Sequence, residues 1–214
     1  MNLIQKISRH PILKPLRIIK KSAERYIYLT FGRPAVSAET SKAKNRRLKE
    51  DFFEKYCQGK GLDIGFGGDL IVPRCQGWDF EHGDAQTLNG LSDSSFDFVY
   101  ASHILEHLPD IATSLKNWWR ILRQNGYLII YLPHRDLYEK KKALPSNWNP
   151  DHKHFFLIDR DEAPDTIGLV PLLHRTLSNF KLIYAKECKE GHTITDPARH
   201  SDGEYSIEAV VQKQ

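Results

Sequence analysis

Short apolar runs alternate with amphipathic segments over most of the chain, and this alternation predicts an α/β domain. Residues 95–101 and 127–132 are mostly apolar and rich in aromatic and branched side chains, which is typical of buried strands. Between them, residues 111–124 predict a helix that ends at Asn125-Gly126. The apolar face of this helix consists of Leu115, Trp118, Trp119 and Leu122. This order of segments indicates a mostly parallel sheet with helices on its faces.

The second half of the chain continues the pattern after one interruption. Residues 135–165 are polar, aromatic and punctuated by proline, so they predict a long loop or lid. A helix is expected near residues 168–178. Residues 181–187 and 205–212 alternate apolar and polar positions, as half-buried strands do. The last two elements of the predicted domain are therefore strands.

The spacing is compressed after the first strand, which we expect to end in the glycine-rich turn within residues 61–68. Gly77 to Asp79 predict the end of a second strand, and Asp84 follows within five positions. A crossover between parallel strands needs about a dozen residues. We therefore expect the usual third strand to be reduced or missing.

Basic residues are concentrated near the N-terminus. Residues 1–50 contain 13 Lys or Arg and 3 Asp or Glu, whereas the remainder contains 18 and 24, so the body is mildly acidic and nucleic-acid binding is not favoured. Residues 12–30 predict a basic amphipathic helix, which fits packing on the body or on a second copy, an anionic membrane surface, or RNA. We expect residues 1–41 to form a helical extension and linker, and residues 42–214 to form the domain, beginning with a helix at 42–57.

The cysteines are few and isolated. Cys57, Cys75 and Cys188 are odd in number and have no metal-ligand spacing, which favours a reducing compartment without disulfides. No apolar run approaches the length of a membrane span. We therefore expect a cytoplasmic protein, with contact to the inner face of the membrane through residues 12–30 as an additional hypothesis.

Within residues 61–68, a short apolar run that predicts a buried strand leads into a glycine-rich turn with the pattern Asp-x-Gly-x-Gly, formed by Asp63, Gly65 and Gly67. A P-loop would need a following Lys-Ser or Lys-Thr, which the turn lacks. A dinucleotide site would need a third glycine where Leu70 stands, and Pro73 leaves little room for the helix that binds the pyrophosphate. The turn therefore does not fit either nucleotide-binding motif.

This turn resembles motif I of the class I S-adenosylmethionine (SAM)-dependent methyltransferases. Further segments resemble the same family in the same order, and the resemblance is closest to its methyltransferase type 11 branch. It implies a Rossmann-like fold whose last strand is antiparallel, with SAM as cofactor. The matching segments are residues 61–68, 83–88, 95–108 and 119–128.

The resemblance assigns cofactor roles to particular residues. Asp63 would hold the turn and the ammonium group, while Gly65 and Gly67 leave room for the methionine part. Asp79 or its neighbour Glu81 would accept the ribose hydroxyls. The remaining assignments concern the two ends of the cofactor: Asp84 and Ala85 would bind the adenine, Phe66 and Phe80 would pack on the cofactor, and Ser102 and His103 would lie near the methionine.

A hydroxyl acceptor would also need a general base, and histidine titrates near neutrality. His134, His152 and His154 are our candidates, because they follow the predicted fifth strand or lie in the loop after it. We expect no metal, since Glu106 and His107 are adjacent and should not share a helix face, and we expect residues 151–154 to be a solvated loop. Tyr138, Trp148, Phe155 and Phe156 would line an acceptor pocket or simply pack the lid.

The sequence thus predicts methyl transfer from SAM to a small molecule or glycan, with an oxygen atom as the favoured methyl acceptor. Relatives of similar layout often work on cell-surface polysaccharides or lipid-linked intermediates, and a basic N-terminus would suit such a membrane-proximal acceptor. Two alternatives stay open: a SAM-binding regulatory protein without turnover, and an RNA or protein methyltransferase docked through the basic extension. The chain lacks the Asn/Asp-Pro-Pro-aromatic motif of many nucleic-acid methylators.

Overall fold

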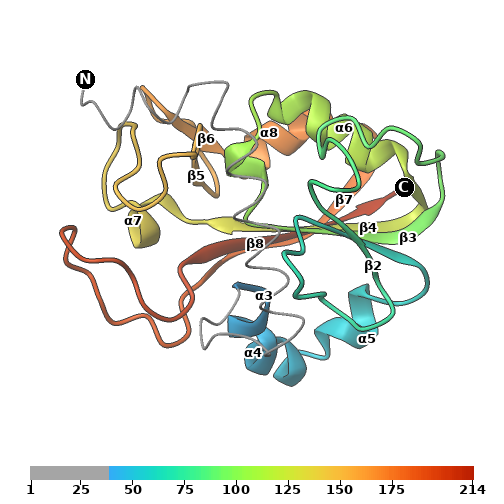
Figure 1. Cartoon of the computed structure of the whole chain (residues 1–214), viewed down its shortest axis with the longest axis horizontal. Helices are drawn as coiled ribbons and strands as arrows, with labels where there is room; N and C mark the ends of the chain where they lie inside the picture. The colour runs from blue at the N-terminus through green and yellow to red at the C-terminus, as the bar shows by residue number, and fades with distance from the viewer. Residues whose placement is uncertain (1–38) are drawn as a thin grey trace. The chain divides into compact units, whose positions relative to one another are not determined.

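The computed structural model describes residues 39–214. The predicted amphipathic helix at residues 12–30 and most of the predicted linker lie outside the described residues. The centre of the domain is a six-stranded sheet in the order β2-β1-β3-β4-β8-β7 (Figure 1). Its strands are β1 (Gly61–Ile64), β2 (Gln76–Trp78), β3 (Phe96–Ser102), β4 (Leu122–Pro133), β7 (Phe180–Cys188) and β8 (Ser206–Lys213).

The sheet confirms the predicted Rossmann-like architecture. β2, β1, β3 and β4 are parallel neighbours, whereas β8 runs antiparallel to both β4 and β7. Residues 79–95 contain no strand, so the third strand is missing as expected, and β2 is left at the edge of the sheet. The short spacing between Asp79 and Asp84 explains this, because no crossover fits there.

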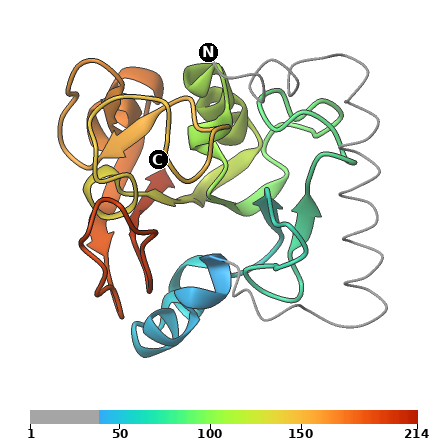
Figure 2. The same ribbon diagram turned by 60° about the vertical axis from the view of Figure 1, so that its left-hand side comes forward.

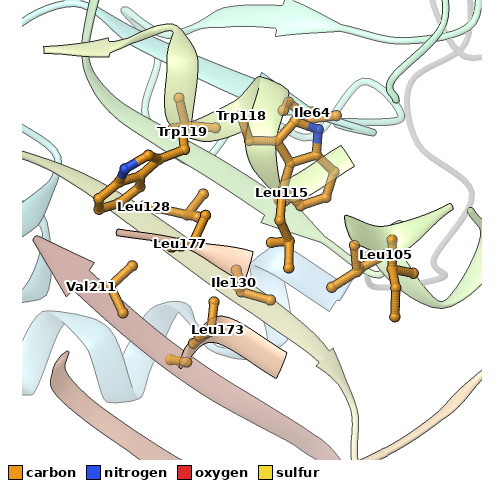
Figure 3. Packing of buried hydrophobic residues seen from close by; sticks show 14 of the residues in the cluster. Ile64, Leu105, Leu115, Trp118, Trp119, Leu128, Ile130, Leu173, Leu177 and Val211 are labelled. Carbon is orange, nitrogen blue, oxygen red and sulfur yellow. The ribbon is translucent and has the colours of Figure 1, made fainter. Parts of the chain in front are cut away.

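Helices cover both faces of the sheet (Figure 1). α6 (Ile111–Arg120) and α8 (Leu169–Thr176) lie on one face, and α3 (Glu39–Lys42), α4 (Lys44–Lys49) and α5 (Phe52–Tyr56) lie on the other. Leu115 and Trp118 of α6 pack against Ile130 of β4 and Leu173 of α8, and all four side chains are almost fully buried (Figure 3). Burial of this kind is the main force that stabilises such a layered domain. Within residues 39–214, no helix combines the length and apolarity needed to cross a lipid bilayer.

Two predicted helices differ from the structure: one ends earlier than expected, and the other is divided. α6 stops at Arg120, and Asn125-Gly126 lies inside β4, where the pairing with β3 shifts between Phe96 and Phe98. The prediction that Asn125-Gly126 ends a helix was therefore wrong. Asn125 has φ 64°, which suits a residue in an irregular strand as well as it suits a helix end. The predicted helix at 42–57 is likewise divided by Asp51, which has φ 54°.

Residues 135–165 are more ordered than a simple loop. They contain α7 (Arg135–Tyr138) and β5 (Phe155–Leu157), and β5 pairs in parallel with β6 (Thr166–Gly168). Phe155 and Phe156 are almost fully buried. Figures 1 and 2 show that the segment after β4 and the long connection between β7 and β8 leave the same end of the sheet.

A buried ionic network joins α4 to β8. Arg47 is fully buried, and its Nε donates to Glu208 Oε2 at 2.8 Å, while Arg46 Nη2 donates to Glu204 Oε2 at 2.9 Å. Burial alone would raise the pKa of Glu208, but the guanidinium groups of Arg47 and Arg46 outweigh it and lower the pKa to about 2. The network therefore holds a charged carboxylate inside the domain.

Candidate functional site

The predicted site residues lie at the carboxyl ends of the parallel strands, which is where ligands bind in open α/β sheets. β1, β2, β3 and β4 all end at this edge. β8 begins there, because Ser206 pairs with Pro133 at the end of β4. The edge thus gathers residues from distant parts of the sequence.

The glycines of the first turn have distinct roles. Gly65, Gly67 and Gly68 all have positive φ (74°, 54° and 86°), which other residues adopt only with strain. A Cβ on Gly65 would lie 3.1 Å from the Ile104 side chain, whereas a Cβ on Gly67 would meet no atom closer than 4.0 Å. The backbone at Gly67 therefore faces open space that a ligand can occupy.

Asp63 stabilises this turn through a hydrogen bond from the segment that follows it. Its side chain is fully buried at the centre of β1, and Oδ2 accepts the N–H of Ile71 at 2.7 Å. Oδ1 is buried and has no hydrogen-bond partner among the residues described. Burial raises the pKa of Asp63 to about 8, although the hydrogen bond from Ile71 opposes the shift. A cationic partner would offset the desolvation cost of the charged Asp63 carboxylate.

Asp79 lies directly against the glycine turn. One carboxylate oxygen accepts the N–H of Gly67 at 3.2 Å, and the other accepts the N–H of Phe80 at 2.8 Å. The Phe80 ring is 73% exposed, whereas the Phe66 ring lies over Gly77 so closely that a Cβ there would clash with it. Phe80 therefore has a free apolar face next to Asp79, and Phe66 is packed on β2.

The predicted adenine loop is anchored on α6. Asp84 is exposed, and its Oδ1 accepts the N–H of Gln86 at 2.8 Å. The carbonyl of Ala85 accepts the indole N–H of Trp118 at 2.8 Å. These bonds fix the loop beside the end of β2, with the Asp84 side chain at the surface.

A cluster of histidine and glutamate side chains follows β3, just beyond Ser102, which is itself buried. Glu106 Oε1 lies 3.8 Å from His103 Nδ1, 3.8 Å from His107 Nε2 and 3.9 Å from His152 Nε2. His152 Nδ1 is hydrogen-bonded to Glu139 Oε1 at 2.6 Å. We call these five residues the His–Glu cluster.

Glu106, Glu139 and His152 are buried, whereas His103 and His107 are partly exposed. Glu106 is 1% exposed, and neither of its carboxylate oxygens accepts a hydrogen bond from another described residue. Burial raises the pKa of Glu106 to about 8, and the nearby Glu139 adds to the shift. Burial also lowers the pKa of His107 to about 4 and holds the pKa of His103 well below its usual value. These two imidazoles are therefore neutral near pH 7.

The three predicted base candidates have separate positions. His152 belongs to the His–Glu cluster, whereas His154 Nε2 is hydrogen-bonded to the carbonyl of Leu108 at 3.1 Å. His134 caps α7, since its Nδ1 accepts the N–H of Asp136 at 3.2 Å. His134 and His154 thus have structural partners.

Two expectations about this region need correction. The solvated loop expected at residues 151–154 has exposed side chains at Asp151 and Lys153, but His152 is only 7% exposed, and the Lys153 N–H donates to the Glu106 carbonyl at 2.8 Å, so the segment is docked on the turn 105–108. Glu106 and His107 also approach each other, because they lie in a single 3₁₀ turn, Leu105–His107, rather than in a long helix. The i, i+3, i+4 spacing of His103, Glu106 and His107 was the signal that sequence reasoning missed.

Of the four residues predicted to line an aromatic pocket, only Tyr138 and Trp148 lie in an aromatic group beside the His–Glu cluster. Phe155 and Phe156 are buried by packing and do not reach an open surface. Tyr138 lies 5.5 Å from His152 and 4.9 Å from Tyr205 between ring centroids, and Trp148 lies 5.5 Å from His200. The aromatic group beside the His–Glu cluster is therefore made by Tyr138, Trp148, His200 and Tyr205.

Comparisons with known proteins agree with this fold. Residues 70–130 match a family model described as a methyltransferase domain. A SAM-dependent methyltransferase from Archaeoglobus fulgidus is 17% identical, covering 92% of this chain and 99% of that chain with a TM-score of 0.51. A SAM-dependent methyltransferase from Thermotoga maritima, described as a possible histamine N-methyltransferase, is 16% identical, covering 92% and 97% with a TM-score of 0.50.

A third structure, determined in work on the conversion of a disulfide bond into a thioacetal group during echinomycin biosynthesis, is 15% identical, covering 80% of each chain with a TM-score of 0.54. At these identities the likeness shows the shared fold. No curated protein sequence matches the chain.

Proposed function

We propose that this chain, which belongs to the class I SAM-dependent methyltransferases of the type 11 branch, methylates an oxygen of a small molecule or glycan. The observation that carries the proposal is the position of the Asp79 carboxylate on the N–H of Gly67, beside open space at the turn. This pairing favours Asp79 over Glu81 as the partner of the ribose hydroxyls.

The residues present fit the cofactor. The open backbone at Gly67 accommodates the methionine part, and the unpartnered Oδ1 of Asp63 suits a nearby ammonium group. The exposed ring of Phe80 suits stacking beside the ribose or adenine. When bound, SAM supplies a methyl group whose leaving group is a neutral thioether, so the protein needs mainly to orient the acceptor and remove its proton.

The His–Glu cluster supports an oxygen acceptor. Its His103 imidazole lies at the strand edge where the resemblance places the methionine end of SAM, and a hydroxyl must lose a proton during methylation. Trp148 adds a recognition element, since its indole Nε1 is buried and has no hydrogen-bond partner among the described residues. An aromatic ring with a free donor suits a sugar with several hydroxyls.

We extend the proposal to a membrane-proximal acceptor, such as a lipid-linked glycan, because of the basic amphipathic pattern at residues 12–30. Binding of the full chain to anionic but not neutral lipid vesicles would support this. Salt-sensitive binding to RNA instead would support the docking-arm alternative.

The experiment uses SAM labelled with ¹³C at the methyl group, and acceptor fractions that contain small molecules or glycans. We expect a product whose methyl carbon has the chemical shift of an O-methyl group. A product with an N-methyl shift would refute oxygen transfer while keeping the enzyme class. Cofactor binding by calorimetry without transfer to any fraction would favour the regulatory alternative.

A further inference from the structure

We propose that Glu106, His107 and His152 form a binding site for one divalent transition-metal ion of the zinc type. Each residue offers one ligand atom, and these atoms lie within 4.8 Å of one another. Metal binding does not depend on the proposed function, but a role at the acceptor oxygen rests on it. The site would deepen that function by giving the acceptor hydroxyl a fixed position.

The spacing of the ligand atoms is close to that of a metal site. Glu106 Oε1 lies 3.8 Å from His107 Nε2 and 3.9 Å from His152 Nε2. Tetrahedral zinc with bonds of about 2.0–2.1 Å holds its ligand atoms roughly 3.4 Å apart. The two pairs that include Glu106 therefore need to close by about half an ångström, and the widest separation in the set, 4.8 Å at most, by about 1.4 Å.

The carboxylate of Glu106 is the second, independent observation. It is almost fully buried, and within residues 39–214 no other residue donates a hydrogen bond to either of its oxygens. Buried polar groups are nearly always hydrogen-bonded or bound to a metal, because desolvation without a partner is costly. A cation between Glu106 and the two imidazoles would supply the missing partner.

The surroundings orient the ligands as metal sites do. His152 Nδ1 donates to Glu139 Oε1 at 2.6 Å, which leaves a lone pair on Nε2, and Nε2 lies 3.9 Å from Glu106 Oε1. His107 has a further hydrogen bond to the backbone of Asp151. A ligating histidine almost always donates its other N–H to a carboxylate or a backbone carbonyl in this way.

The ligand set selects the class of metal. Two imidazoles and one carboxylate suit zinc and neighbouring transition metals, whereas magnesium and calcium prefer oxygen ligands. Three protein ligands leave a fourth position open, as in catalytic zinc sites. An acceptor hydroxyl or a water molecule can occupy that position.

The test uses the full chain without an affinity tag, stripped with a chelator and then titrated with zinc chloride alone. We expect one tightly bound zinc ion per chain, and cobalt in its place should give the intense visible bands of a tetrahedral ion. Glu106→Gln and His152→Gln should each weaken zinc binding at least about 100-fold, and Glu139→Gln by about 10- to 100-fold. His174→Gln removes an exposed imidazole of α8 and should leave zinc binding unchanged.

Calorimetry with S-adenosylhomocysteine checks that each variant is folded, and it also tests cofactor binding apart from the metal. Zinc that stays unbound in the stripped wild-type chain would overturn the proposal, even if the cofactor binds. Zinc binding that survives both Glu106→Gln and His152→Gln would also overturn it. If the variants do not fold, the cobalt spectrum of the wild-type chain decides: bands typical of water-ligated octahedral cobalt would refute the site.

Discussion

Replacing Asp79 by Asn is the most direct test of the cofactor site. The substitution keeps the shape of the side chain but removes its charge. In the structure, the two carboxylate oxygens accept the N–H groups of Gly67 and Phe80, and the side chain is partly exposed. These bonds lie near the surface, so we expect a loss of less than about 1 kcal/mol in folding free energy.

The effect on cofactor binding should be much larger. A hydrogen bond to a charged group contributes about 1.5–3 kcal/mol, and charge-assisted bonds are about twice as strong as neutral ones. Two ribose hydroxyls that lose the charge of Asp79 should therefore cost about 1.5–3 kcal/mol in total. This corresponds to a Kd for S-adenosylhomocysteine that rises about 10- to 150-fold.

Titration calorimetry measures the Kd, and the thermal midpoint confirms that the variant is folded. Glu81→Gln is the matched control, since it removes a neighbouring exposed carboxylate. If Asp79→Asn binds within threefold of the wild type, Asp79 does not hold the ribose. A larger effect from Glu81→Gln would transfer the role to Glu81.

Three further predictions concern the domain around the site. Leu115→Ala should lower the free energy of unfolding by about 2–5 kcal/mol in urea titrations, because the Leu115 side chain of α6 is fully buried in the core. Lys116→Ala, at the exposed neighbouring position, should change the free energy of unfolding little. The pKa of Glu208 is lowered to about 2, so the charged carboxylate should add roughly 3 kcal/mol to the free energy of unfolding above about pH 4.5, and this stabilisation should be lost as the pH falls toward 2. If Glu208→Gln leaves the acid unfolding curve unchanged, this prediction is wrong. His154→Ala should reduce methyl transfer at least about tenfold while S-adenosylhomocysteine binds normally, because the bond to Leu108 fixes the segment that carries His152. Weaker binding of S-adenosylhomocysteine to that variant would show that the His154 segment also supports the cofactor site, against this prediction.

Local patterns were sufficient for the strands and the glycine turn. Residues 95–101 and 127–132 carry enough contiguous apolar side chains to specify buried strands, and they form β3 and β4. The missing third strand was predictable because chain length alone forbids a crossover between Asp79 and Asp84. Asn125-Gly126 misled the prediction, since positive φ serves helix ends and irregular strands alike.

By itself, the sequence determined the Rossmann-like order of elements, the family resemblance and the Asp79 position, because each depends on neighbours within a few residues or on a count of residues. Only the tertiary structure decided which histidines lie together. His152 and Glu106 are distant in sequence, and they meet because Lys153 and His154 bond to the backbone of the turn after β3. Such contacts depend on how a loop folds back on the sheet, and no periodicity along the chain records that path.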